Sequence, residues 1–306
     1  MSSPSTFQIH QSKFQNLELL ARQVVEGFII GLHKSPFHGF SVEFAEHRLY
    51  NQGDALRHID WRVFGRTDKL FVKRFEEETN LRCCLAIDTS SSMHFSGDEG
   101  KMSKLQFAIL SAASILQLLK RQLDAAALAL FDQDIHYLSA CKSTSSHYRL
   151  LTSQLERFLE SKVQNKTTNA SVALHQIAEQ MHKRSLVVIF SDMMDDAAQI
   201  EELFSALQHL RYNKHEVILF HILEGKREAD FEFENRPFEF VDLETGEKIK
   251  LQPQQIKDQY LAQMDDFRLM IESRCHQYGI DRVAVDLSRP VEQVLYSFLV
   301  KRNKLL

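Results

Sequence analysis

Two aspartates follow apolar segments of the sequence, and hydroxyl residues accompany them. Asp88 ends one apolar segment and Asp192 ends another, while Thr167 and Thr168 precede a third apolar stretch. Asp88 is followed at once by four hydroxyl residues: Thr89, Ser90, Ser91 and Ser92. Carboxylate, hydroxyl and water oxygens are the ligands that a hard cation takes in proteins. If folding brings these loops together, they form a site for Mg²⁺, or for Mn²⁺ or Ca²⁺.

The segments that must position these residues alternate between strand-like and helix-like patterns from residue 81 onward. Short apolar runs predict strands at 82–88, 126–131, 185–192, 215–223 and 281–287. Helical spacing of apolar residues predicts helices at 103–122, 146–160, 169–182, 197–211, 254–277 and 290–302. Strands that alternate with helices predict a doubly wound α/β domain with a mostly parallel sheet. The strands are almost wholly apolar, so both faces of the sheet should be covered.

A doubly wound sheet gives the two aspartates a common location. Ligands of such folds bind outside the carboxyl ends of the strands, where Asp88 and Asp192 are expected. A simpler explanation remains open for each residue taken alone, because Ser, Thr and Asp are common in loops and as helix caps. Asp192 could cap the helix expected at 197, and Ser92 could cap a turn. The metal site therefore depends on convergence of the loops.

The chain divides into three predicted parts. Residues 1–32 contain an N-terminal helix, residues 33–80 form a segment of short strands and turns, and residues 81–306 form the α/β domain. Within that domain, residues 228–252 interrupt the alternation and predict a β excursion.

Composition excludes several functional classes. A net charge of −4 provides no basic face for nucleic acid. No apolar run reaches the roughly 18 residues of a membrane span. The N-terminus lacks the basic and apolar regions of a signal peptide, and the four cysteines lack CxxC spacing. Together these features predict a cytoplasmic protein with reduced thiols.

Enzyme motifs are missing from the sequence. There is no G-x-S-x-G, no H-E-x-x-H, no phosphate-binding P-loop and no G-x-G-x-x-G. We therefore expect a non-catalytic binding module. Two alternatives stay open: a Mg²⁺-dependent phosphoester hydrolase using metal-activated water, and an adaptor whose metal site is empty.

A second group of polar residues lies upstream, between residues 44 and 78. It includes Arg48, Asp54, Arg57, Asp60 and Trp61. These residues could form a solvated charge network over a small β layer, or they could bind a partner.

Two resemblances to known families make the predicted metal site and the role of the upstream segment more specific. The order D-x-S-x-S from Asp88 to Ser92, followed by a threonine and then Asp192, resembles the metal-ion-dependent adhesion site of von Willebrand factor A domains. The resemblance implies that Ser90, Ser92 and Thr168 bind the ion through hydroxyls, and that the aspartates act mainly through waters. It favours Thr168 over Thr167, because Asn169 and a helix follow. Met193 stands where that family often has glycine.

The segment from Arg48 to Trp61 reads R-x-Y-x-x-G-D-x-x-R-x-I-D-W. It resembles the signature of a family of unknown function, the fifty-eighth of that series, which joins this segment to a von Willebrand factor A-like domain. Its members are typically encoded beside MoxR-type AAA ATPases. The resemblance implies an adaptor that works with such an ATPase in protein assembly, maturation or stress response, on a protein client that offers a carboxylate.

Overall fold

The computed structural model describes most of the 306-residue chain and separates it into two compact units. It describes residues 16–33, 47–49, 65–67, 69, 71–73, 81–98, 100–159, 170–194, 200–243 and 246–303. One unit combines Met1–Ile30 with Leu81–Leu306, and the other is Gly31–Asn80. The N-terminal helix up to Ile30 therefore groups with the α/β domain.

The larger unit is built on a six-stranded sheet in the order β10-β7-β6-β3-β4-β5. Its strands are β3 (Arg82–Asp88), β4 (Ala125–Phe131), β5 (Ile135–Leu138), β6 (Leu186–Ser191), β7 (Glu216–Leu223) and β10 (Asp281–Asp286). All neighbours pair in parallel except β4 and β5, which are antiparallel. The predicted α/β class with a mostly parallel sheet is thus confirmed.

The order of the strands creates a switch point beside β3. The chain passes from β3 to β4 on one side and later places β6 on the other side. Ile87 of β3 lies opposite Phe190 of β6, so Asp88 and Ser191 follow at the same edge of the sheet. The carboxyl ends of two such strands form the usual ligand-binding position of an open α/β sheet.

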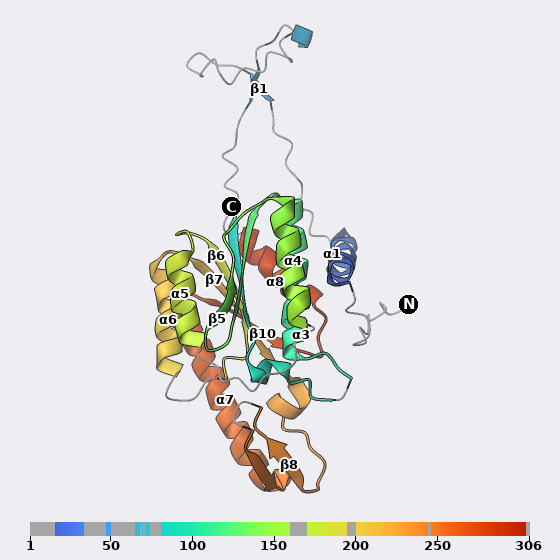
Figure 1. The fold of residues 1–306 in the computed structure, drawn as a ribbon, viewed down its shortest axis with the longest axis vertical. Coiled ribbons are helices and arrows are strands. Elements are labelled where there is room, and N and C mark those ends of the chain that lie inside the picture. Colours follow the sequence, from blue (N-terminus) through green and yellow to red (C-terminus); the bar gives the residue numbers. More distant parts are fainter. Residues whose placement is uncertain are drawn as a thin grey trace. The chain divides into compact units, whose positions relative to one another are not determined.

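Helices cover both faces of the sheet (Figure 1). They are α1 (Leu17–His33), α3 (Lys104–Arg121), α4 (Ser145–Leu159), α5 (Ala170–Gln180), α6 (Ile200–Tyr212), α7 (Pro253–Tyr278) and α8 (Glu292–Asn303). The helices α5 and α6 lie on one face, and α3 and α4 lie on the other. Every residue of β6 is buried, as is every residue of β3 after Arg82, which explains why these strands read as continuous apolar runs.

The helix α1 presents one apolar face to the rest of its unit. Leu17, Ala21 and Val25 are fully buried and follow the four-residue spacing of a helix face. Ion pairs of 3.6 Å join Glu18 to Lys120 and Glu26 to Arg121 at the end of α3.

The predicted β excursion exists, although it begins with a helical turn. A π-helical turn, η4 (Gly225–Ala229), follows β7, and the strands β8 (Phe238–Val241) and β9 (Lys248–Leu251) form an antiparallel hairpin. Phe231 stacks on Tyr260 of α7, with 4.3 Å between ring centroids. The excursion therefore has a small aromatic core that attaches it to the first half of α7.

The smaller unit is described only in part. Its strands β1 (His47–Leu49) and β2 (Phe71–Lys73) pair in an antiparallel ladder, with Arg48 opposite Val72.

Throughout the described residues, no helix is long and apolar enough to cross a membrane. The four cysteines are free thiols, and three of them are buried.

Candidate metal centre

The carboxylate of Asp88 joins the ends of β3 and β6. Its Oδ1 accepts a hydrogen bond of 2.9 Å from the backbone N–H of Ser90, and its Oδ2 accepts one of 2.7 Å from Ser191 Oγ. Asp88 is 1% exposed. Both oxygens of a buried acid are thus fixed by its own loop and by the neighbouring strand, as a positioned ligand or a second layer of a metal site requires.

The hydroxyl run after Asp88 divides into alternate residues. Ser90 Oγ and Ser92 Oγ lie 3.1 Å apart, because the 3₁₀ turn η3 (Ser91–His94) folds the loop back on itself. Thr89 belongs to a different contact: its N–H and its hydroxyl both donate to the carbonyl of Phe131 on β4. The hydroxyls of Ser90 and Ser92 are therefore hydrogen bonded to each other, which holds the two alternate residues side by side.

This spacing agrees with the geometry of a small hard cation. Adjacent ligands of an octahedral Mg²⁺, with bonds of about 2.0–2.1 Å, lie about 2.9 Å from each other. The distance between Ser90 Oγ and Ser92 Oγ is 3.1 Å. The Ser92 side chain also lies near enough to the Asp192 carboxylate to help lower its pKa, which brings the second predicted acid to the same place. The described members of the predicted set thus fit a metal ion held mainly by hydroxyls and water.

The backbone after Asp192 takes a shape that normally favours glycine. Met193 has a φ of 54°, in the left-handed region, and its N–H donates to Ser191 Oγ at 2.9 Å. A side chain in this conformation costs about 1 kcal/mol or more. Met193 is 2% exposed, so burial of its side chain in the core offsets that cost. The glycine-like turn is therefore retained without glycine.

A buried lysine meets Asp192 from the other side. Lys104 Nζ lies 2.6 Å from Asp192 Oδ2 and 2.6 Å from Glu228 Oε1, and the Lys104 side chain is fully buried. Lys104 is the first residue of α3, directly after Ser103. A capping box between Ser103 and Gln106 fixes this helix start. The centre thus contains an internal cation between two carboxylates.

The two aspartates differ in their electrostatic environment. Burial, followed by the negative charge of Asp192, raises the pKa of Asp88 to about 7, although hydrogen bonds from Ser90 and Ser191 oppose this. Burial also acts to raise the pKa of Asp192, but the charge and hydrogen bond of Lys104 outweigh it, and that pKa is lowered. Asp192 is hence the ionised member of the pair, and Asp88 takes a proton readily.

A neutral histidine holds the loop that carries Asp192. His221 Nε2 lies 2.9 Å from the Asp192 carbonyl oxygen, and Arg282 donates to His221 Nδ1 at 3.1 Å. Since Nδ1 accepts from the arginine, Nε2 carries the proton that the carbonyl accepts. Burial and the adjacent Arg282 charge lower the pKa of His221 to about 4. The neutral imidazole of His221 therefore supports the Asp192 loop by donating a hydrogen bond to the Asp192 carbonyl.

The structure places some predicted residues together and leaves others outside its description. Asp88, Ser90, Ser92 and Asp192 converge at one edge of the sheet. Arg48 lies on β1. Six residues of the two predicted sites fall outside the described ranges: Thr167, Thr168, Asp54, Arg57, Asp60 and Trp61. Their roles stay predictions.

Sequence reasoning missed four residues of the centre: Lys104, Ser191, His221 and Glu228. For Lys104 the sequence does contain a signal of an unusual environment. Lysine at the first position of a helix opposes the helix dipole, and acids are the residues favoured there. The first turn of α3 contains no acid. Among the described residues, no three carboxylate, imidazole or thiol side chains gather as a metal site, so a centre here depends on hydroxyl ligands.

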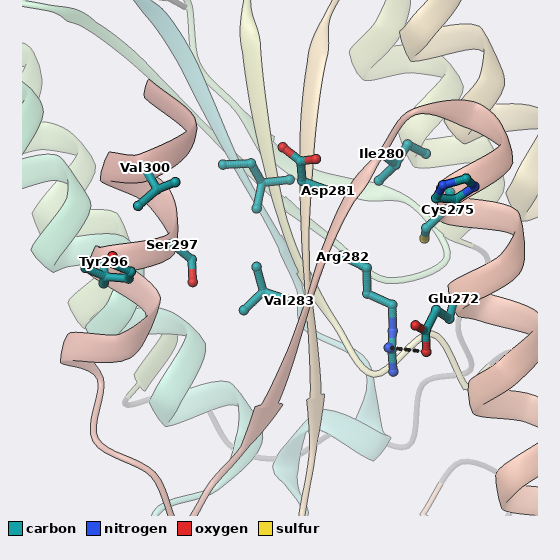
Figure 2. A pocket seen from close by; sticks show the side chains of 11 residues that line it. Glu272, Cys275, Ile280, Asp281, Arg282, Val283, Tyr296, Ser297 and Val300 are labelled. Atoms are coloured by element: carbon teal, nitrogen blue, oxygen red, sulfur yellow. Dashed lines mark ion pairs between the residues drawn. The ribbon is translucent and has the colours of Figure 1, made fainter. Parts of the chain in front are cut away.

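A separate cavity of about 420 Å³ lies over the edge strand β10, between α7 and α8 (Figure 2). Glu272 and Cys275 come from α7, Asp281 and Arg282 from β10, and Ser297 from α8. Arg282 forms an ion pair of 3.6 Å with Glu272 and also donates to His221. Arg282 thus connects the cavity to His221, which contacts the Asp192 loop. The cavity itself does not lie at the carboxyl edge of the sheet.

Comparison with known families identifies the chain. The family model described as a protein of unknown function, DUF58, matches residues 46–268, which is well over half of the sequence. The chain belongs to the DUF58 family. The match includes the Arg48–Trp61 segment and all four converging residues of the centre, so these lie within the family's common region.

Relatives and solved structures add no activity to the DUF58 assignment. The uncharacterized proteins Rv1480 of Mycobacterium tuberculosis and Mb1516 of Mycobacterium bovis are each 33% identical over 101 residues, which is 33% of this chain and 31% of each relative. The chain thus spans about a third of the length of the curated relatives it matches. BatB from Bacteroides thetaiotaomicron is 15% identical with a TM-score of 0.46, covering 73% of this chain and 99% of that one. An aerotolerance-related membrane protein from Bacteroides fragilis is also 15% identical, with a TM-score of 0.45 over 72% of this chain and 99% of that one.

Proposed function

We propose that this DUF58 chain is a non-catalytic protein-interaction adaptor with a von Willebrand factor A-like domain. Its metal-ion-dependent adhesion site would use Asp88, Ser90, Ser92, Thr168 and Asp192 to hold Mg²⁺, with Mn²⁺ or Ca²⁺ as substitutes. The adaptor would act in the cytoplasm with a MoxR-type AAA ATPase, in protein assembly, maturation or stress response.

One observation carries the proposal: four residues from two separate loops meet at the carboxyl edge of β3 and β6. Asp88 and Asp192 influence each other's ionisation, and the hydroxyls between them lie at the spacing of neighbouring octahedral ligands. Adjacent parallel strands bring their ends together in any case, so the proposal is supported by which residues gather there: two buried carboxylates and two hydroxyls.

The residues divide the work between them. The hydroxyls of Ser90 and Ser92 would contact the ion directly, while Asp88 and Asp192 would orient waters and supply negative charge. When bound, Mg²⁺ would supply an electrophilic position that accepts a carboxylate oxygen. Since the hydroxyl ligands are uncharged, a partner's aspartate or glutamate can complete the site, which suits docking of a protein client.

The test is a pull-down in which the immobilised chain captures a MoxR-type ATPase and any client proteins that bind with it. Immobilised wild-type chain and the Asp88→Ala variant are compared in Mg²⁺ and in EDTA, with circular dichroism to confirm folding. We expect retention of a partner in Mg²⁺ and its loss in EDTA and in the variant. Equal retention in Mg²⁺ and EDTA would refute a metal-dependent interaction. Release of phosphate from a phosphoester that requires Asp192 would favour the hydrolase.

A further inference from the structure

Lys104 occupies an environment in which an ammonium group is costly. Its side chain is fully buried, and it stands at the amino end of α3, where the helix dipole opposes positive charge. Burial of an unpaired charge costs several kcal/mol. The carboxylates of Asp192 and Glu228, each 2.6 Å away, offset that cost, and the Phe95 ring centroid lies 6.0 Å from the ammonium.

The same ammonium engages an oxygen that a divalent ion would need. Asp192 Oδ2 contacts Lys104, and Asp192 Oδ1 accepts a weaker hydrogen bond of 3.3 Å from the Met194 N–H. The negative charge of Asp192 is thus compensated before any metal ion arrives. A cation that approaches from the side of Ser90 and Ser92 meets a carboxylate already shared with a positive group.

Glu228 is fixed so that it can keep the ammonium in place. Its Oε2 accepts the Glu224 N–H at 2.8 Å, and its backbone carbonyl accepts the Tyr260 hydroxyl at 2.8 Å. These contacts leave Oε1 directed at Lys104. Glu228 can therefore hold the lysine charge when Asp192 turns toward another cation.

We propose that Lys104 is a resident competitor of the divalent cation, which shares Asp192 with the ion and sets the ion affinity of the centre. The inference rests on the proposed function, because it concerns the same metal site. It makes Lys104 a positioning and affinity-determining residue, not a ligand. Removal of its charge should strengthen ion binding, whereas a purely structural lysine should weaken binding or leave it unchanged when it is lost.

The experiment measures Mg²⁺ binding by titration calorimetry and Mn²⁺ binding by electron paramagnetic resonance, on the full chain. Lys104→Met removes the charge, and Lys104→Gln removes it while retaining a hydrogen-bond donor. Arg227→Met is the matched control, because it deletes a nearby positive charge that is 39% exposed and paired with Asp98. We expect both Lys104 variants to bind at least about tenfold more tightly than wild type, and Arg227→Met to change affinity by less than about threefold.

A fourth variant decides the question if the lysine variants fold poorly. Glu228→Gln keeps the lysine but leaves its ammonium to Asp192 alone, so binding should weaken about tenfold. Unchanged or weaker binding by a folded Lys104→Gln chain, or tighter binding by Glu228→Gln, would overturn the inference.

The failure of the proposed function has a different signature. Absence of binding by wild type and by every variant contradicts both proposals. Binding by the Lys104 variants alone would support the competitor and contradict a metal-dependent wild-type adaptor.

Discussion

The buried ion pairs of Lys104 allow a quantitative test of folding stability. Lys104→Met replaces the ammonium by an apolar group of similar length and leaves Asp192 and Glu228 facing each other. The side chains of these acids are only 2% and 10% exposed, so water cannot compensate them. Removal of one partner from a buried pair costs about 3–5 kcal/mol of unfolding free energy.

The chain offers a matched control of equal geometry. Arg274 and Glu201 also approach to 2.6 Å, but their side chains are 32% and 68% exposed. Arg274→Met should therefore cost less than about 1 kcal/mol. Glu228→Gln added to Lys104→Met removes one uncompensated charge, and it should restore about 1–3 kcal/mol.

The measurement is urea unfolding in metal-free buffer, followed by far-ultraviolet circular dichroism for each variant. A comparable urea dependence of the free energy shows that the same surface unfolds in each case. A loss below about 1 kcal/mol for Lys104→Met, or a loss equal to that of Arg274→Met, would show that the triad is not a desolvated charge cluster.

Three further predictions follow from single contacts. Ser103→Ala breaks the capping box of α3, and it should lower the unfolding free energy by about 1 kcal/mol in the same urea assay. Ser92→Ala removes one predicted ligand and should weaken Mg²⁺ binding at least about tenfold by calorimetry, whereas Ser96→Ala on the same loop should not. The pKa of His221 is about 4 in the folded chain and about 6.5 in the unfolded chain. The unfolded state therefore takes up the proton first as the pH falls below 6.5, and the free energy of unfolding should drop by about 3 kcal/mol between pH 6.5 and pH 4. His221→Gln should lack this loss in urea unfolding at each pH, and since Asp88 titrates in both proteins, the difference between them reports the histidine.

Much of the α/β unit could be predicted because its elements are locally encoded. The predicted strand 82–88 agrees with β3 at both ends, and the predicted helix 254–277 differs from α7 by one residue at each end. Continuous burial on both faces produces the apolar runs that define such strands. The convergence of Asp88 and Asp192 could also be predicted, because neighbouring parallel strands end at the same edge of a sheet.

The charge partners could not be predicted, because they join residues far apart in sequence. Lys104 lies 88 positions from Asp192 and 124 from Glu228, and no local pattern encodes either pair. Glu228 is the first residue of the predicted excursion, but the alternating pattern gave no sign of the π-helical turn that carries it. The left-handed conformation of Met193 has no signal in the residue type itself, and only the resemblance, in which glycine often stands at this position, pointed to it.

The central claim is that the edge of β3 and β6 binds a divalent cation, and crystals soaked in Mn²⁺ test it most directly. An anomalous difference map locates the ion without reference to any assumed ligand. We expect one strong peak within about 2.3 Å of Ser90 Oγ and Ser92 Oγ, close to Asp192. A map with no peak there at saturating Mn²⁺, or with its only peaks at distant surface carboxylates, would contradict the claim.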